Sequence, residues 1–319
     1  MNLSLLDAEL AVALDAFPAL DIWTDLPSTR NMFAQFYGDL VATLPVIKNV
    51  ASADFQVPCV QGPDVNVRVY RPADQTQKLP ALLWIHGGGF CIGSLHEDDY
   101  RARQLVENLG TVVVSVDYRL APEHPFPAPM DDCYAALHWL SENCDQLQID
   151  RDYIGIGGLS AGAGLAAGLG LLARDRGEIK VIFQALLCPM IDNRCASPSS
   201  FSVTDERVWN RRSNLKGWDA YLGTEQSDQV LPSVYAAPSR AENLEGLPDT
   251  YIAVGTVDMF IDEDRDYAER LQKAGVPTQL EIFSGGFHAF EFIVPDAAIS
   301  KAALATHYRA IKAGLFPAG

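Results

Sequence analysis

Long hydrophobic runs are missing from the 319-residue sequence. None of its apolar stretches reaches the roughly 18 residues that a membrane-spanning helix needs. Residues 1–17 have some helical periodicity, but they carry Asp7, Glu9 and Asp15 and lack the basic start and small-residue cleavage site of a signal peptide. The sequence therefore argues against a membrane protein and predicts a cytoplasmic location.

Positive charge is also scarce. The sequence has 24 Lys and Arg residues against 41 Asp and Glu residues, which gives a formal net charge of −17. No basic cluster offsets this excess, so most of the surface would repel a phosphate backbone or an anionic membrane. Nucleic acid and membranes are therefore not expected as partners, and a neutral small molecule fits the composition better.

Paired cysteine motifs are absent as well. The six cysteines are scattered, and no two of them form a C-x-x-C pair. In a chain of this size without an export signal, this pattern predicts reduced thiols that pack as small hydrophobic side chains. No cysteine lies in a recognisable nucleophile turn.

Strand-like and helix-like segments alternate through the central part of the chain. Several strand-like runs are hydrophobic throughout, which is typical of strands covered on both faces of a parallel sheet. The predicted strands cover 65–70, 81–86, 111–118, 153–160, 181–188, 250–256 and 278–283, and the predicted helices lie near 98–109, 127–143, 161–175, 262–274 and 296–313. This order predicts an α/β fold with a mostly parallel, doubly wound sheet.

Two segments interrupt this alternation. Residues 1–50 are predicted as aromatic-containing helices before any strand, and residues 192–245 form a long insertion rich in Ser, Arg and Trp. Connections of that length inside an α/β unit are uncommon. We predict that both segments form a helical cap over the carboxyl edge of the sheet, where such folds bind ligands. Residues 51–319 would then be the catalytic domain; the alternative is a solvent-exposed helical appendage.

A G-x-S-x-G motif at 158–162 is the strongest local signal. It stands at the end of an apolar run and at the start of a segment rich in Ala and Gly. A serine in a tight turn between a strand and a helix has a strained backbone conformation that only small neighbours permit. Its hydroxyl then points off the sheet edge, and the helix amino terminus favours negative charge nearby. Chance matches to so short a motif are common, but this context makes Ser160 the predicted nucleophile.

Three consecutive glycines follow another predicted strand, in the segment HGGGF at 86–90. Consecutive glycines weaken regular structure, but their backbone N–H groups can point unobstructed into a cavity. A tetrahedral intermediate carries an oxyanion that needs such donors, each worth roughly 3–4 kcal/mol of barrier lowering. The predicted donors are Gly88, Gly89 and Ala161, and the predicted supporting residues are His86 and Gly87. The alternatives are a flexible turn or a phosphate-binding loop, but the latter would need a Lys-Ser or Lys-Thr pair, which is missing here.

One histidine and one aspartate stand where partners of the serine are expected. His288 follows the last predicted strand in a glycine-containing loop, and Asp258 follows the strand before it. The chain order serine, acid, histidine is that of α/β hydrolases. A buried carboxylate would fix the histidine tautomer and stabilise the imidazolium that forms during reaction. By contrast, His96 and His307 are predicted at the surface, and the acidic residues at 262–264 as the first turn of a helix.

Five segments together closely resemble the hormone-sensitive lipase-like esterases, the bacterial branch called family IV. They are HGGGF at 86–90, DYRLAPEHPFPAPMDD at 117–132, GLSAGA at 158–163, DMFIDED at 258–264 and GFHAF at 286–290. The resemblance implies a helical cap, with Ser160 as nucleophile, Asp258 as acid, His288 as base and oxyanion donors at Gly88, Gly89 and Ala161. The departures are Leu159, Ala163 and Gly164 within the family's GDSAGGN motif, and Met259 where the family has proline.

The expected activity is hydrolysis of short-acyl carboxylic esters through an acyl-enzyme, with no metal and no organic cofactor. Phe90, Trp209 and Trp218 are candidate substrate contacts, with ordinary core packing as the alternative. Two other functions stay open: an amidase or peptidase with the same three residues, and a non-catalytic ligand receptor of the same fold. Dimers occur in the family, so the chain is also a candidate homodimer.

Overall fold

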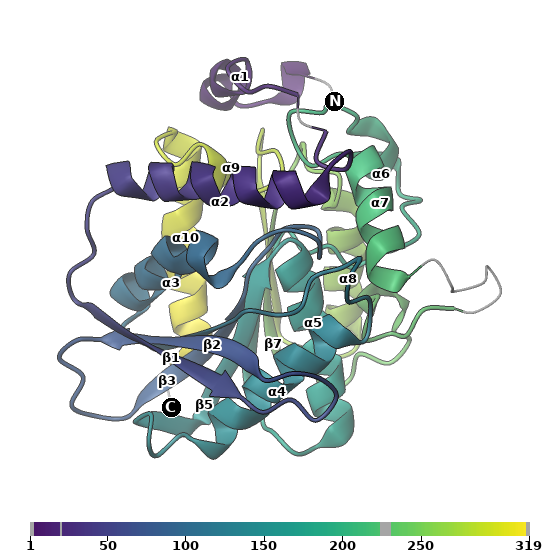
Figure 1. Cartoon of the computed structure of the whole chain (residues 1–319). Helices are drawn as coiled ribbons and strands as arrows, with labels where there is room; N and C mark the ends of the chain where they lie inside the picture. Colours follow the sequence, from purple (N-terminus) through teal and green to yellow (C-terminus); the bar gives the residue numbers. More distant parts are fainter. Residues whose placement is uncertain (1–2, 20, 224–230, 317–319) are drawn as a thin grey trace.

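The computed structural model describes residues 3–19, 21–223 and 231–316. An eight-stranded sheet with helices on both faces forms its centre (Figure 1). The strands are β1 (Val50–Val57), β2 (Val65–Pro72), β3 (Leu79–Ile85), β4 (Val112–Val116), β5 (Ile149–Leu159), β6 (Phe183–Leu187), β7 (Asp249–Gly255) and β8 (Thr278–Phe283). The helices are α1 (Ala8–Leu14), α2 (Leu26–Thr43), α3 (Leu95–Leu109), α4 (Ala128–Glu142), α5 (Ala161–Arg176), α6 (Pro198–Ser202), α7 (Arg211–Leu222), α8 (Ile261–Lys273), α9 (Phe290–Ile293) and α10 (Ala298–Leu315), with short 3-10 helices at Leu3–Leu5 and Pro238–Arg240.

The strands lie in the order β1-β2-β4-β3-β5-β6-β7-β8. β2 is antiparallel to both of its neighbours, and the strands from β4 to β8 in this order are parallel. The predicted α/β class with a mostly parallel, doubly wound sheet is therefore confirmed. The sequence pattern did not reveal β1, an edge strand in which only the two end residues, Val50 and Val57, are buried.

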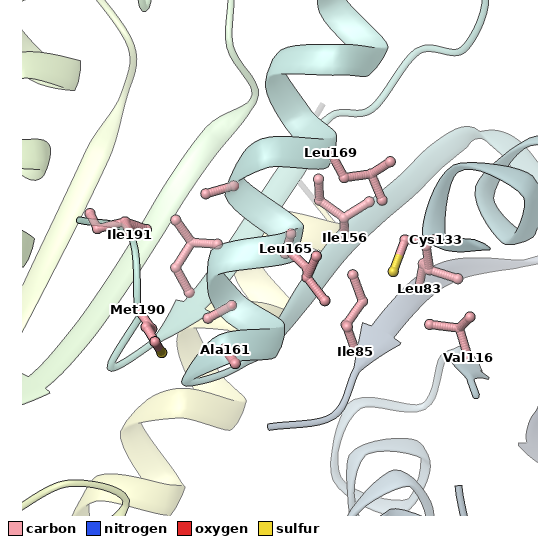
Figure 2. Packing of buried hydrophobic residues seen from close by; sticks show 14 of the residues in the cluster. Leu83, Ile85, Val116, Cys133, Ile156, Ala161, Leu165, Leu169, Met190 and Ile191 are labelled. Atoms are coloured by element: carbon pink, nitrogen blue, oxygen red, sulfur yellow. The ribbon is translucent and has the colours of Figure 1, made fainter. Parts of the chain in front are cut away.

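Hydrophobic cores lie on both faces of the sheet. In β3, Leu83 and Ile85 belong to one core, and Leu82 and Trp84 belong to the other. Successive side chains of a strand point to opposite faces, so this strand is buried throughout and its sequence is continuously apolar. Figure 2 shows α5 on the first of these faces, with Leu165 near Ile85. All six cysteines lie in the described ranges, where they are buried and unpaired.

The first predicted cap segment, residues 1–50, contacts loops that follow sheet strands. From α2, the Arg30 side chain donates to the carbonyl oxygens of Cys91 (2.8 Å) and Ala121 (3.0 Å), which lie beyond β3 and β4. Just before α1, the Asp7 N–H donates to the Gly285 carbonyl at 3.1 Å, beyond β8. Figure 1 shows α1, α2, α6 and α7 on the same side of the molecule, above the sheet. Within the described ranges, no helix combines the length and the apolar character needed to cross a bilayer.

One predicted surface residue is buried. His307 on α10 is only 2 % exposed, and its Nδ1 lies 2.8 Å from the Tyr251 hydroxyl. The surface prediction was wrong because α10 packs against the sheet with the face that carries Ala303, His307 and Ile311, all of them buried. Their spacing of four residues is that of one helix face, and this signal in the sequence could have placed His307 inside.

Candidate active site

The predicted nucleophile lies at the junction of β5 and α5. Ser160 has a φ of 56° and a ψ of −120°, a conformation that residues other than glycine rarely adopt. Its N–H donates to the Leu187 carbonyl at 2.8 Å, and its carbonyl accepts from the N–H groups of Gly164 (2.9 Å) and Met190 (3.1 Å). The end of β6 and the residues beyond it therefore hold the turn that carries the serine.

The glycines on either side of this turn are required by the neighbouring end of β3. A Cβ on Gly158 would lie 2.5 Å from the Ile85 carbonyl oxygen. A Cβ on Gly162 would overlap the carbonyl oxygens of both Ile85 and His86. Ordinary contacts between non-bonded carbon atoms are about 3.5–4.0 Å. The G-x-S-x-G pattern therefore follows from the close packing of this turn against β3.

Replacing Gly162 by alanine is expected to destabilise the fold by about 3 kcal/mol, because the added methyl group must displace backbone atoms. Gly38→Ala is the matched control: Gly38 lies within α2, and nothing lies within 4 Å of the position a Cβ would take. That substitution is expected to be stabilising by up to about 1 kcal/mol. Urea unfolding measures both changes, and an unchanged free energy of unfolding for Gly162→Ala would contradict the packing argument.

A continuous hydrogen-bonded chain joins the three predicted catalytic residues. Ser160 Oγ lies 2.8 Å from His288 Nε2, and His288 Nδ1 lies 2.8 Å from Asp258 Oδ2. With the proton on Nδ1, the imidazole donates to the carboxylate while Nε2 accepts from the serine hydroxyl. The three side chains are buried, and they come from positions 128 and 30 residues apart in the sequence. The fold thus brings together all three residues that the sequence singled out.

Neighbouring groups fix the acid and the histidine. Asp258 Oδ1 accepts the N–H of Phe260 at 3.0 Å, so each carboxylate oxygen has a partner. The Phe260 ring meets the His288 ring edge-on, with centroids 5.1 Å apart and an interplanar angle of 85°. Packing and hydrogen bonding of this kind hold an imidazole in one orientation. The geometry of the chain is therefore set before any substrate binds.

The predicted oxyanion loop lies against the serine. A Cβ on Gly87 would be 3.5 Å from the Ser160 Cβ. Gly88 and Gly89 have φ values of 116° and 57°, which favour glycine. Within the described parts of the chain, the backbone N–H groups of Gly88, Gly89 and Ala161 donate no hydrogen bond to another residue. These donors are therefore available to a group that enters the site.

His86 supports this loop. Its Nδ1 lies 2.8 Å from the Gly87 carbonyl oxygen, and its ring stacks on Tyr118 with centroids 4.3 Å apart. Burial lowers the pKa of His86, which keeps the ring uncharged at neutral pH. The Tyr118 hydroxyl donates to the His86 carbonyl at 3.1 Å. The contacts of His86 thus connect the glycine loop to the segment after β4.

The three candidate substrate contacts occupy different environments. Phe90 and Trp218 are 1 % and 2 % exposed, and Phe90 stacks on Tyr221 with centroids 3.9 Å apart. Trp209 is only partly buried, its ring covers the face of Gly89, and its centroid lies 6.5 Å from that of His288. Of the three, Trp209 is therefore the best placed to meet a substrate, while Phe90 and Trp218 pack in the core.

Comparison with known proteins identifies the family. A family model described as the alpha/beta hydrolase fold matches residues 82–292, more than half of the chain. The chain belongs to the α/β-hydrolase family. The predicted membership of the hormone-sensitive lipase-like esterases is also confirmed.

Several similar proteins carry esterase names. Carboxylesterase NlhH of Mycobacterium tuberculosis is 37% identical over 243 residues, covering 74% of this chain and 75% of that protein. Esterase LipI of the same species is 36% identical and covers 92% of this chain and 91% of its own. A solved structure described as a bacterial heroin esterase has a TM-score of 0.95 at 39% identity, with 99% of this chain and 100% of that chain covered.

Sequence reasoning missed two buried acids of this α/β hydrolase. Glu263 and Asp264, predicted only as part of an acidic first helical turn, are 6% and 0% exposed. Glu263 Oε1 accepts the N–H groups of Ile191 and Asp192, both at 3.2 Å, and so ties the start of the insertion to α8. Burial, and then the nearby Glu263 carboxyl, raises the pKa of Asp264 well above its usual range. The buried Leu271, seven positions beyond Asp264, reveals this inward face in the sequence.

Asp264→Asn is expected to stabilise the fold increasingly as the pH rises. Because the folded state keeps the Asp264 proton to a higher pH than the unfolded state, wild-type stability falls as the pH increases above the unfolded pKa of about 3.9. The amide cannot ionise, and each unit by which the folded pKa is raised is worth about 1.4 kcal/mol. Urea unfolding at about pH 4 and about pH 8 measures the difference. The control is Asp266→Asn, on the exposed face of α8, whose difference in unfolding free energy from wild type should not grow with pH. If the unfolding free energies of wild type and Asp264→Asn changed with pH in parallel, the expectation would be contradicted.

Proposed function

We propose that this α/β hydrolase is a serine carboxylesterase that hydrolyses short-acyl carboxylic esters through an acyl-enzyme. The observation that carries the proposal is the hydrogen-bonded chain from Ser160 through His288 to Asp258. Such a chain activates a hydroxyl that is a poor nucleophile on its own. The esterase names of the similar proteins support an ester as the bond that is broken.

In the first step, Ser160 Oγ attacks the ester carbonyl carbon while His288 Nε2 takes its proton. Asp258, hydrogen-bonded to Nδ1, stabilises the imidazolium that forms and is not itself protonated. The tetrahedral oxyanion is stabilised by the free N–H groups of Gly88, Gly89 and Ala161. Collapse of this intermediate breaks the ester C–O bond, and the alcohol leaves with the proton held by His288.

In the second step, water replaces the alcohol. His288 takes a proton from the water, the hydroxide attacks the acyl-enzyme carbonyl carbon, and the same backbone donors bind the second oxyanion. Breakage of the acyl C–O bond returns the proton from His288 to Ser160 and releases the acid. The cycle restores the hydrogen-bonded chain with which it began.

The partly buried Trp209 supports the preference for short acyl groups. Its ring covers Gly89, one of the oxyanion donors, and Asn214 Oδ1 accepts its indole N–H at 3.2 Å. Asn214 itself is fully buried and donates to the Cys195 sulfur at 3.0 Å. The indole is therefore held as a rigid wall next to the reacting carbonyl, where a long acyl chain would collide with it.

Trp209→Ala is expected to shift the preference towards longer acyl chains. Removing the ring opens space beside Gly89, so kcat/KM for nitrophenyl octanoate relative to nitrophenyl acetate should rise at least about tenfold. Trp209→Phe keeps an aromatic wall and should change this ratio by less than about threefold. An unchanged ratio in Trp209→Ala would remove Trp209 from the acyl pocket.

Hydrolysis of nitrophenyl butyrate and of the matching nitroanilide tests the proposed function. The carboxylesterase proposal expects turnover of the ester to exceed that of the amide by at least about a hundredfold. Labelling by a fluorophosphonate probe, which requires an activated serine, separates both enzymes from a ligand receptor. Comparable rates on ester and amide would favour the amidase, and absence of labelling with absence of turnover would favour the receptor.

The substrate in this proposal is a small, uncharged ester. The formal net charge of −17 disfavours nucleic acid and anionic membranes as partners. In both steps of the proposed reaction, the catalytic groups are side chains and backbone N–H groups of the chain. A cytoplasmic location and a homodimer belong to the same proposal.

A further inference from the structure

A set of metal-ligating side chains includes the acid and the base of the proposed active site. Cys188, the residue after β6, offers a sulfur atom, and one donor atom each of Cys188, Asp258 and His288 all lie within 4.8 Å of one another. The three side chains are buried. Thiolate, imidazole and carboxylate are the ligands that Zn²⁺ takes in proteins. The proposed reaction makes no use of Cys188.

We propose that Cys188, Asp258 and His288 bind one thiophilic divalent cation, Zn²⁺ or Cd²⁺, and that the bound cation inactivates the enzyme. We infer binding of the cation from the donor atoms of these three residues alone. Inactivation by the bound cation rests on the proposed function, because it requires His288 to act as the base.

The spacing of the donor atoms suits a single ion. Zinc bonds of about 2.0–2.3 Å hold neighbouring ligand atoms about 3.3–3.8 Å apart. The three donor atoms lie within 4.8 Å of one another, so they are at most about 1.5 Å further apart than a zinc site requires. Small side-chain rotations can close a difference of that size. Binding would replace the hydrogen bond between His288 Nδ1 and Asp258 Oδ2 by two bonds to the metal.

A small cavity beside these residues supplies further polar atoms. Cys188, Asp258, Glu291 and His307 all line it. His307 Nε2 has no hydrogen-bond partner among the described residues, and it lies 3.5 Å from Glu291 Oε1. A tetrahedral ion needs a fourth ligand, which a water molecule in this cavity or the Glu291 carboxylate can provide. The unpaired Nε2 of His307 at the same cavity can form a hydrogen bond with that water molecule.

Carboxyl groups beside Cys188 favour a divalent cation. The side chains of Asp258 and Glu291 line the same cavity as Cys188. Carboxylates next to a sulfur ligand attract a thiophilic cation such as Zn²⁺ or Cd²⁺. On binding, the sulfur bonds to the metal and its proton leaves to solvent, with no change of oxidation state. Hard cations such as Mg²⁺ prefer oxygen ligands and are not expected to compete.

Occupation of the site stops the proposed reaction at its base. When the Nδ1 lone pair of His288 bonds to the metal, the neutral imidazole carries its hydrogen on Nε2, which then has no lone pair to take the proton of Ser160. The displaced Asp258 carboxylate also no longer holds the ring in line with the serine. Inhibition should therefore reverse when a chelator removes the ion.

Cadmium titration of the purified protein tests the proposal with two readouts. The cadmium–thiolate bond has a charge-transfer absorption in the ultraviolet, which reports binding whether or not the protein hydrolyses esters. Hydrolysis of nitrophenyl butyrate reports inactivation. The variants are Cys188→Ala and Cys188→Ser, with Cys133→Ala as the matched control, since Cys133 is also buried but lies on α4.

Wild type and Cys133→Ala are expected to bind one Cd²⁺ per chain with thiolate absorption, to lose activity in parallel, and to regain it with chelator. Both Cys188 variants should lack this absorption and need at least about 30-fold more Cd²⁺ for half-inhibition. Thiolate absorption that persists without Cys188, or an unchanged half-inhibiting concentration, would overturn the proposal. Should neither variant fold, absence of thiolate absorption in wild type, or equal inhibition by Mg²⁺, would overturn it as well. Absorption in a wild type that shows no ester hydrolysis would support the metal site while counting against the proposed function.

Discussion

Ser160→Ala is expected to lower kcat for nitrophenyl butyrate about a million-fold and to leave KM nearly unchanged. Without Oγ no acyl-enzyme can form, and the hydrogen bond of 2.8 Å to His288 Nε2 is lost. The residual acceleration would come from the backbone donors of Gly88, Gly89 and Ala161 and from substrate binding, as in other enzymes that have lost a nucleophile. Steady-state kinetics on protein purified from an esterase-deficient host measures the loss.

Ser115→Ala is the control for this substitution. Ser115 is a buried serine within β4, and β3 lies between β4 and β5, the strand that leads to Ser160. Its replacement should leave kcat within about twofold of wild type, because the surroundings of Ser160, His288 and Asp258 do not change. Retention of more than about one per cent of wild-type kcat by Ser160→Ala would assign the nucleophile to another residue.

Asp258→Asn is expected to lower kcat by about ten-thousand-fold, with the fold intact. The amide is nearly the same size as the carboxylate, and its oxygen can still accept the Phe260 N–H. Its NH₂ group, however, would donate to His288 Nδ1 and so leave the proton on Nε2, where a lone pair is needed to accept the proton of Ser160. The neutral side chain also stabilises the imidazolium far less.

The neighbouring Asp262 provides the matched control. Its Oδ2 accepts the Ser199 N–H at 2.8 Å, and an amide oxygen can keep that hydrogen bond in Asp262→Asn. This variant should therefore retain kcat within about threefold of wild type. If Asp262→Asn instead lost as much activity as Asp258→Asn, Asp258 would not be distinguished as the acid.

The positions of the catalytic candidates could be predicted because they follow strands with an unbroken apolar sequence. β5 and β7 are buried almost throughout their second halves, and Ser160 and Asp258 come directly or closely after them. Parallel strands end at the same edge of a sheet, so residues far apart in sequence meet there. Glycine spacing added the shape of the turn, since the end of β3 leaves no room for a side chain at Gly162.

Other features depended on what packs against them, which the sequence does not state. β1 covers only an edge, so most of its side chains stay exposed and its pattern is weak. Glu263 and Asp264 are acidic residues, a type that usually lies at a surface, and the spacing to Leu271 is too weak a signal on its own to show that α8 turns both inward. Trp209 could be proposed as a substrate contact, but its separation from the core-packed Phe90 and Trp218 follows only from the arrangement of α7 over the glycine loop.

The hydrogen bond from Asp7 to Gly285 has a consequence for biosynthesis. It joins the segment before α1 to the loop that carries His288, and α1 buries Leu10 and Leu14 in the core. A contact with so large a sequence separation can form only after nearly the whole chain has left the ribosome. The apolar side chains of this first helix therefore stay exposed to solvent while the rest of the chain is translated. Chaperone binding to this nascent amino-terminal segment, and slow acquisition of activity after release, are the outcomes that this topology favours.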